Sequence, residues 1–435
     1  MRQLTAFLTL LTLVVLMACV PVAPPPAAEA PAEEPMELEF WHALSSSMGE
    51  ILNEQIQEFN TSQAEVRLAG VYMPWLELRQ KFLAATIAGN PPSLSMVDYS
   101  HTKFFAREGA YEPINNWASE EDMQDFIPAL LDDSTLNGQV YALPVNRSTQ
   151  GLFYNKDLFR KVGLDPERPP ETWEELREYA AQLTDPSKQQ YGTYAHLISW
   201  FFDPLVSEWG GRLNDDECNV TFHKEGGVEA MDFMQDLLHE DSYAVLPAVL
   251  SGPFDQQVIE FINGQVGMMR HSTAIQRFIG NLVDFDWGFA MWPAGPAGRA
   301  VTHGGKNIAI SANASPEEKA AAWKFVRFLT STEQSARFHM ESGYMPTRYS
   351  VTDLPEVKAF HAENPSWLVS VKQLEFAEPT ACANFNVPEY SSIILESMDR
   401  IVVNNEDAAT VLAEAAAQLQ STIDALRAEG KLVLE

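Results

Sequence analysis

The 435-residue chain is poor in the residues and motifs that most catalytic and metal sites need. It has three cysteines and nine histidines, and no C-x-x-C pair or histidine cluster sets them at ligand spacing, so we predict no metal site. The signatures of serine hydrolases, zinc proteases, phosphate-binding loops and dinucleotide-binding turns do not occur in it. We therefore predict no catalytic residue and no cofactor. The adjacent acids Asp215 and Asp216 lie in a Gly- and Asn-rich stretch, which favours solvated surface carboxylates over a glycosidase pair.

Basic residues are also scarce. Lysine and arginine number 29 against 60 acids, which gives a formal net charge of −31. An acidic chain is repelled by nucleic acid phosphates and by anionic lipid head groups, so both are poor partners. The charge does not identify a small ligand, because a pocket can be locally basic.

The chain has one long apolar run. It spans residues 5–17 behind Met1-Arg2, and it has the length of a signal-peptide core but is too short to span a bilayer with confidence. The run ends in Leu16-Met17-Ala18-Cys19, which resembles a bacterial lipobox and implies lipidation of Cys19 after removal of a signal peptide, residues 1–18. The alternative is an ordinary signal with an incidental cysteine.

Residues 19–36 are rich in Pro, Ala and Glu. Prolines disfavour helix and sheet, so we expect an extended tether behind the lipidated Cys19. The protein would then be extracytoplasmic, in the periplasm or on the outer face of the cell membrane, and would contact the membrane through its lipid alone.

The two remaining cysteines, Cys218 and Cys382, would face an oxidising compartment. They can form a disulfide there, or they can be two separate buried thiols, and the sequence leaves both open.

Hydrophobic periodicity indicates an α/β protein. Residues 37–42 alternate acidic and apolar side chains, which is typical of a half-buried strand, and helix 48–59, strand 66–71, helix 75–88 and strand 94–98 follow, as expected of βαβ units. Strands are predicted at 139–144, 151–154, 265–269, 286–290 and 307–311. Helices are predicted at 155–163, 172–183, 227–239, 254–263, 316–329, 332–341 and 407–429.

Aromatic and polar residues gather at expected strand ends and turns. In open α/β sheets ligands bind beyond the carboxyl ends of strands, and aromatic faces there suit the C–H faces of sugars while polar neighbours fix hydroxyls. Each aromatic taken alone also fits a packing role. The candidates of this kind are Trp41, Trp75, Asp98, Tyr99, Trp200, Trp209 and Tyr344.

Several motifs resemble those of the extracellular solute-binding proteins of carbohydrate-type ABC importers, in particular those that bind glycerol-phosphate compounds. The longest is residues 146–173, NRSTQGLFYNKDLFRKVGLDPERPPETW. Shorter ones are Phe40-Trp41-His42, Gly89-Asn90-Pro91-Pro92, Phe261-Ile262-Asn263-Gly264, His303-Gly304-Gly305 and Ser342-Gly343-Tyr344-Met345-Pro346. Together they cover nearly the whole chain after residue 37.

The resemblance implies a two-lobed α/β fold of the type II periplasmic-binding-protein kind, with hinge strands between the lobes. We expect residues 37–145 with 300–345 in lobe 1, and 146–299 with 346–435 in lobe 2. It also implies a monomer that closes on a small solute and presents it to the membrane subunits of an importer, whose ATPase is a separate protein.

Carried over position by position, the family's site residues fall on a polar turn and on several strand ends. These are Trp75, Asp98, Tyr99, Arg147, Ser148, Arg270, Ser272, Gly304, Gly305, Tyr344 and the region of Asn386. Two positions depart from the glycerol-phosphate binders: Ala383 stands where they have a phosphate-clasping arginine, and Tyr99 where they have an acid. An oligosaccharide, a polyol and a glycerol-phosphate compound all remain candidate solutes.

The sequence leaves three functional readings. A binding module for an importer is favoured by the resemblance. An exported glycan-active enzyme would show turnover with the purified protein. A receptor that passes its ligand to a sensor kinase would share the fold and differ in its partner.

Overall fold

The structure is a computed structural model that describes residues 34–195, 198–224, 226–246 and 256–434. The chain divides into residues 1–34 and a compact body of residues 35–435. The predicted signal peptide (residues 1–18), Cys19 and most of the tether lie outside the described residues. Within the described ranges, no helix combines the length and apolar character that crossing a bilayer requires.

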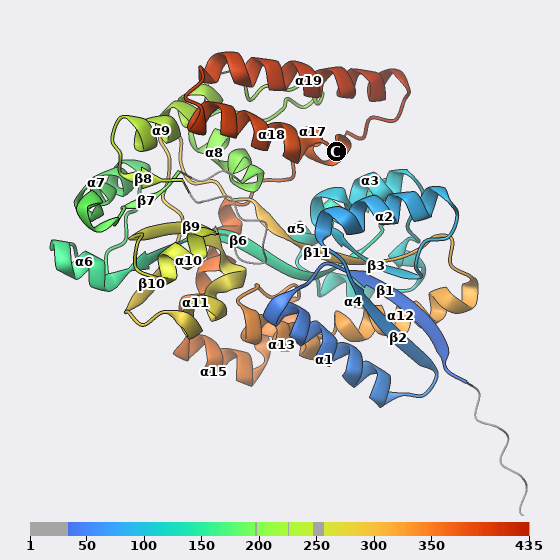
Figure 1. Cartoon of the computed structure of the whole chain (residues 1–435). Helices are drawn as coiled ribbons and strands as arrows, with labels where there is room; N and C mark the ends of the chain where they lie inside the picture. The colour runs from blue at the N-terminus through green and yellow to red at the C-terminus, as the bar shows by residue number, and fades with distance from the viewer. Residues whose placement is uncertain (1–33, 196–197, 225, 247–255, 435) are drawn as a thin grey trace, which may run out of the picture. The chain divides into compact units, whose positions relative to one another are not determined.

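A seven-stranded sheet runs through the body (Figure 1). Its order is β10-β6-β11-β3-β1-β2, and β9 also pairs with β6. The strands are β1 (Met36–His42), β2 (Val66–Tyr72), β3 (Leu94–Asp98), β6 (Leu143–Asn155), β9 (Met268–Ser272), β10 (Trp287–Ala290) and β11 (His303–Ile310). Two short pairs stand apart from it, β4 (Thr135–Leu136) with β5 (Gln139–Val140) and β7 (Thr193–Tyr194) with β8 (Ala244–Val245).

The first lobe is built on the parallel strands β1, β2 and β3. Leu38 and Phe40 of β1 are buried in a core with Phe325, as the alternating pattern predicts. On the other face of the sheet, Val97 packs with Phe82. Helices cover both faces: α1 (Ser46–Ser62), α12 (Pro316–Leu329) and α13 (Thr332–Ser342) on one, and α2 (Trp75–Ile87) and α3 (Thr102–Arg107) on the other (Figure 1).

Strand β6 passes from one core to the other. Its first part, residues 143–149, pairs with β11, and its second part, residues 150–155, pairs with β9 and β10. Leu143 belongs to the first lobe's core, whereas Leu152 belongs to a second core that also contains Trp173. β6 is therefore a continuous connection between two lobes.

The predicted break between residues 144 and 151 is wrong, and so is the polar turn expected at Arg147 and Ser148. Both residues lie inside β6, which is buried along its whole length. Pro144 is accommodated because the ladder with β11 shifts register between Lys306 and Asn307, opposite Pro144. At such an irregularity a missing N–H does not remove a ladder hydrogen bond.

The second lobe is mostly helical. Several helix ends follow the predicted signals: the Thr172 side chain accepts a hydrogen bond from the Glu175 N–H, and Gly163 ends α6 in the left-handed region with φ of 87°. The helices of this lobe are α6 (Lys156–Val162), α7 (Trp173–Leu183), α8 (Phe202–Glu208), α9 (Gly227–His239), α10 (Gln256–Ile262), α11 (Gln276–Leu282), α16 (Trp367–Lys372), α17 (Cys382–Asn386), α18 (Tyr390–Met398) and α19 (Ala408–Ala428).

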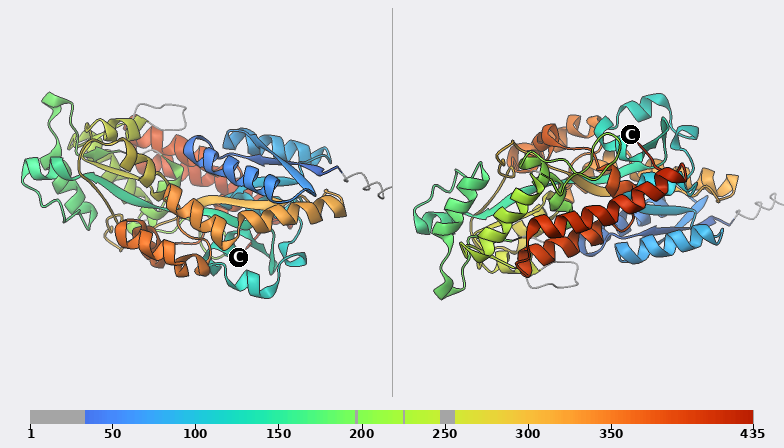
Figure 2. Two further views of the ribbon diagram at one scale, coloured as in Figure 1. Left: turned by 90° about the horizontal axis from the view of Figure 1, so that it is seen from below. Right: turned by 90° about the horizontal axis from the view of Figure 1, so that it is seen from above.

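Cys218 and Cys382 form a disulfide, with their Cα atoms 5.6 Å apart. Both are buried in the second lobe's core. Of the two alternatives that the sequence left open, the structure therefore has the disulfide and not two separate thiols. Nearby, α18 and α19 run side by side across this lobe (Figure 2).

Residues 346–363 return to the first lobe. Here α14 (Tyr349–Asp353) and α15 (Pro355–Glu363) pack on α13 through a small core of Ala336, Val351 and Val357. The Arg348 guanidinium binds the carboxylates of Asp122 and Asp125. Asp122 belongs to α4 (Glu120–Gln124), which is followed by α5 (Pro128–Leu131).

Candidate binding site

A cavity of about 340 Å³ lies beside the crossing strand β6. Residues of both lobes wall it. From the first lobe and the connecting strands come Trp75, Asp98, Tyr99, Ser100, His101, Ser148, Gly304, Gly305 and Lys306; from the second lobe come Ile198, Ser199, Trp200, Asn384, Tyr390 and Ser391.

The first-lobe wall forms where β3 ends. Asp98, the last residue of β3, caps the turn Tyr99–His101, because its Oδ1 accepts hydrogen bonds from the backbone N–H and the hydroxyl of Ser100 at 3.2 and 2.8 Å. Trp75 begins α2 directly after Pro74. Its side chain is unusually open for a tryptophan, with the residue 49% exposed.

An ion pair lies at the centre of this wall. Lys306 is the β11 residue opposite Asp98 of β3, and its Nζ is 2.5 Å from Asp98 Oδ2. Burial alone raises the pKa of Asp98, but Lys306, His101 and the Ser100 hydroxyl outweigh burial and bring this pKa to about 2. Burial lowers the pKa of His101 to about 4. At neutral pH Asp98 is therefore ionised and His101 is neutral.

Two glycines let other groups approach this wall closely. Gly305 has φ of 145°, and a Cβ there would lie 2.1 Å from the carbonyl oxygen of Asn146. At Gly304 a Cβ would lie 3.1 Å from the indole of Trp200. The Trp200 Nε1–H donates to the His303 carbonyl at 3.2 Å, so this indole lies across the β11 backbone.

The second-lobe wall is aromatic with polar groups behind it. The Tyr390 hydroxyl donates to Asp203 Oδ1 at 2.6 Å. Asp203 is buried, and this burial raises its pKa to about 7, although the Tyr390 and Asn384 hydrogen bonds act in the opposite direction. The wall thus offers Tyr390 and Asn384 in fixed orientations, with a titratable carboxyl behind them.

Seven of the fourteen ligand-binding residues predicted from the sequence line this cavity. They are Trp75, Asp98, Tyr99, Ser148, Trp200, Gly304 and Gly305. Residues that follow strands β2 and β3, the crossing strand, and the Gly-Gly pair are thus brought together from distant parts of the sequence.

Both arginines predicted to bind the ligand lie outside the cavity. Arg147 is fully buried, and its guanidinium donates to the carbonyl oxygens of Asn146, Leu130 and Lys306 and to Asn307 Oδ1. The guanidinium carbon of Arg270 lies 4.2 Å from the ring centre of Trp292 in the second lobe. Burial lowers the pKa of Arg270 to about 10, and Glu208 opposes this shift.

Five further predicted residues also lie outside, each with contacts of its own. Trp41 donates to Glu39, Trp209 packs edge-on against Trp173, Ser272 caps the turn at Ala274, Tyr344 packs on Phe338, and Asn386 accepts from Arg107 and the Val433 N–H.

Eight lining residues were not predicted. They are Ser100, His101, Ile198, Ser199, Lys306, Asn384, Tyr390 and Ser391. Ser100 and His101 continue the Asp98-Tyr99 turn, and Lys306 follows the Gly-Gly pair, so position beside a predicted residue was a usable signal. Ala383, where the resembled family has an arginine, is fully buried, and the next residue, Asn384, faces the cavity.

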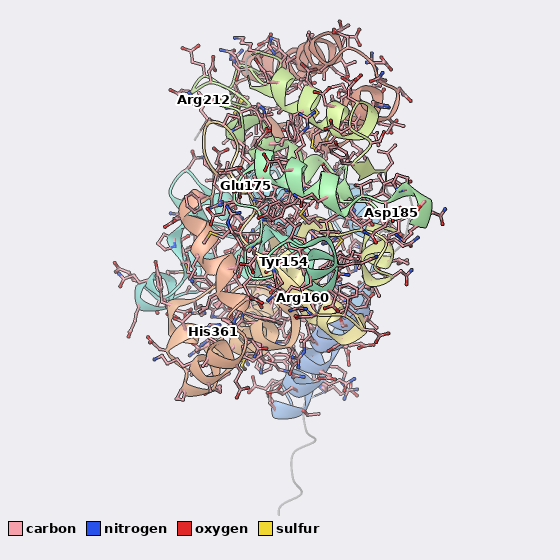
Figure 3. All side chains as sticks on the ribbon, turned by 90° about the vertical axis from the view of Figure 1, so that its left-hand side faces the viewer. Tyr154, Arg160, Glu175, Asp185, Arg212 and His361 are labelled. Carbon is pink, nitrogen blue, oxygen red and sulfur yellow. A yellow bond between two sulfur atoms is a disulfide. The ribbon has the colours of Figure 1, made fainter. Side chains whose placement is uncertain are left out.

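A larger cavity of about 490 Å³ lies in the second lobe, bordered by residues 211–216 and 378–382. Arg212, one of its lining residues, is labelled near the top of Figure 3, well away from His361 of α15 at the lower left. Arg212 already binds Asp216, and Asp215 accepts hydrogen bonds from Asn219. Its described lining residues include neither an aromatic side chain nor a residue of the first lobe, so the cavity beside β6 is the stronger candidate for the binding site.

Comparison with known proteins identifies the family of the chain. The sequence model of the family described as bacterial extracellular solute-binding protein matches residues 54–364. The chain belongs to this family. The match includes α2, β3, β6 and β11, which build the first-lobe wall of the cavity.

Relatives and solved structures extend the match to most of the chain. The sn-glycerol-3-phosphate-binding periplasmic protein UgpB of Escherichia coli strain 536 is 25% identical over 398 residues, which cover 86% of this chain and 90% of that protein. UgpB of Mycobacterium tuberculosis, solved with glycerophosphocholine, superposes with a TM-score of 0.79 at 27% identity, over 89% of this chain and 98% of that one. The GacH receptor of Streptomyces glaucescens, solved unliganded and with acarbose, gives a TM-score of 0.80 at 23% identity, over 90% and 99% of the two chains.

These likenesses confirm the two-lobed type II fold predicted from the sequence. They also place the protein outside the cytoplasm, as its family description and its periplasmic relatives indicate. It is an extracytoplasmic solute-binding protein.

Proposed function

We propose that this protein captures a sugar or sugar-like solute between its lobes and presents it to the membrane subunits of an ABC importer. Oligosaccharides, polyols and glycerol-phosphate compounds are the candidate solutes. The observation that carries the proposal is the cavity beside β6, which residues of both lobes wall. Its volume of about 340 Å³ falls in the usual range for small-molecule sites.

The lining supports a polyhydroxylated ligand. Trp75 and Trp200 offer aromatic faces for sugar C–H groups. Ser148, Asn384 and Lys306 offer hydrogen-bond partners for hydroxyls. The relatives point the same way, since one binds sn-glycerol 3-phosphate and one was solved with glycerophosphocholine.

Closure follows from the two walls. A solute that touches both lobes gains its full set of contacts only when the lobes approach, so binding shifts the population toward the closed form. We propose the lobe boundaries 37–145 with 300–345 and 146–299 with 364–435. We assign residues 346–363 to lobe 1, because Arg348 binds Asp122 and Asp125 there.

We also propose that the chain is a monomer held to the membrane by a lipid on Cys19. The lipobox-like sequence before Cys19 supports the anchor. Mass spectrometry of the protein isolated from its cells should find a diacylglyceryl group at Cys19, and Cys19→Ser should release the protein from the membrane fraction. A Cys19→Ser protein that stays membrane-bound would contradict the anchor.

A binding role without turnover is proposed because the relatives are binding proteins. The test is a thermal-shift screen of the purified protein, stripped of carried-over solute, against sugars, polyols and glycerol phosphodiesters, followed by calorimetry and product analysis. We expect at least one compound to raise the melting temperature with no product formed. Turnover of a glycan that is lost on changing one carboxylate would favour an exported enzyme.

A further inference from the structure

The cations at the cavity are already engaged by groups of the protein. Lys306 Nζ lies 2.5 Å from Asp98 Oδ2, and the two side chains are only 19% and 25% exposed. They are also paired by backbone register, since Lys306 of β11 lies opposite Asp98 of β3. The sheet therefore holds this ion pair in place before any ligand arrives.

Arg79 is a second cation near the site, in a narrow pocket that adjoins the cavity and shares Trp75, Asp98, His101 and Lys306 with it. Its Nη1–H donates to the Pro388 carbonyl at 3.1 Å and lies 2.9 Å from His101 Nε2. Its charge also faces the carboxylates of Glu389 and Asp98. Arg79 thus serves the contact between the lobes.

The more distant arginines do not supply a free positive charge. Arg147 lies behind the wall with its guanidinium bonded to backbone carbonyls and Asn307. At the position where the resembled family has an arginine, Ala383 is buried. Among the described lining residues of the cavity, Lys306 and Asp98 are the charged pair, and their charges cancel.

A phosphate group that bound Lys306 would also lie next to the Asp98 carboxylate. The two negative groups would repel each other strongly in this partly desolvated site, because little water is present to screen their charges. A hydroxyl has no such conflict, since it can donate to Asp98 and accept from Lys306 at the same time. The ion pair is therefore suited to a diol and unsuited to a phosphate ester.

We propose that Asp98 is a specificity-determining residue, which makes this site select uncharged polyhydroxylated solutes and reject their phosphate esters by neutralising Lys306. The inference rests on the proposed function and narrows its substrate class. It also predicts that Asp98→Asn, which keeps the shape and the hydrogen bond from Ser100 but removes the charge, gives the site affinity for anions.

The test is calorimetry with matched probes on the purified full-length protein. Each neutral solute that binds is paired with its own phosphate ester, and sn-glycerol 3-phosphate, glycerophosphocholine and inorganic phosphate are added as phosphate probes. For the unaltered protein we expect the neutral member of each pair to bind about 10- to 100-fold tighter than its phosphate ester. This factor corresponds to one charge-assisted hydrogen bond. For Asp98→Asn we expect affinity for sn-glycerol 3-phosphate to rise by a similar factor.

The double variant Asp98→Asn with Lys306→Met is the matched control, and it should lose the gained anion affinity. Circular dichroism melting shows whether each variant is folded, and if Asp98→Asn is not, the neutral-to-phosphate ratio of the unaltered protein decides alone. Tighter binding of any phosphate probe than of every neutral solute by the unaltered protein would overturn the inference, as would no anion gain in a folded Asp98→Asn protein. Failure of every solute, neutral or phosphorylated, to bind the unaltered protein would instead contradict the proposed function.

Discussion

Trp75→Ala tests the site most simply, because Trp75 lines the cavity and is about half exposed. A tryptophan side chain offers about 150–250 Å² for burial, and the residue is 49% exposed, so roughly 100 Å² remains for a ligand to cover. At about 25 cal/mol per Å² this area contributes about 2–3 kcal/mol to binding. We therefore expect Trp75→Ala to weaken solute binding by about 30- to 150-fold.

The solute-free protein should lose less stability in this variant than it would on truncation of a fully buried tryptophan. About half of Trp75 is buried, and its contacts include the Arg79 guanidinium, whose carbon lies 5.6 Å from the ring centre, a contact worth about 0.5–1 kcal/mol at an exposed site. Trp173, which is 4% exposed, provides the contrast, since truncating a buried tryptophan costs about 3–5 kcal/mol. Calorimetric titration with a solute from the screen and chemical denaturation of both variants measure the two effects. A Trp75→Ala protein that binds solute normally, or that unfolds as readily as Trp173→Ala, would show that Trp75 is not a ligand-binding residue.

Three further predictions follow from single features of the fold. Replacing Cys218 and Cys382 by serine should lower the free energy of unfolding by about 3–5 kcal/mol, since the disulfide closes a loop with a sequence separation of 164; denaturant titration with and without reductant checks this. Gly305→Ala should destabilise the protein more than Gly298→Ala, because both glycines have positive φ but only a Cβ at 305 meets backbone; equal losses in melting temperature would show that φ alone matters. The folded-state pKa of Asp203 is raised to about 7 from 3.8, so the stabilising contribution of its protonated form is complete below pH 3.8 and is lost as pH rises through 7, with a slope of at most about 1.4 kcal/mol per pH unit. Asp203→Asn should therefore flatten the pH dependence of the free energy of unfolding between pH 3.8 and 7, and an unchanged pH dependence would contradict the raised pKa.

The first βαβ elements were predictable because each carries its own pattern. Alternation fixes β1, and the apolar faces of α1 and α2 follow from helical spacing. Local capping residues also sufficed, as at Thr172 and Gly163. These features depend on neighbours within a few residues, which sequence patterns report directly.

The long strand β6 was missed because Pro144 and Gly151 interrupt its pattern and because it is buried on every side, so polar residues such as Arg147 lie inside it. Its continuity depends on β9, β10 and β11, which come more than a hundred residues later. The short helices between residues 349 and 398 were also missed. Among them, α14 and α15 are stabilised by packing on α13, and α17 and α18 by packing in the second lobe's core.

The candidate site also contains residues that the sequence could predict and residues that it could not. Trp75 and Asp98 were predictable, because residues after parallel strands converge at one sheet edge. The Lys306–Asp98 pair was not, since it depends on antiparallel register between residues 208 positions apart. Trp200 and Trp209 lie close together in the sequence, yet one faces the cavity and the other packs against Trp173, and only the tertiary structure separates their roles.

We propose above all that a solute bridging the two walls draws the lobes together around β6. Small-angle X-ray scattering of the purified protein, stripped and then saturated with a compound that calorimetry shows to bind, measures this directly. We expect a smaller radius of gyration in the saturated sample. Trp75→Ala should show no such change at a solute concentration that saturates the unaltered protein but leaves this variant mostly unbound. Identical scattering for the stripped and saturated protein, with binding confirmed in the same samples, would contradict the claim.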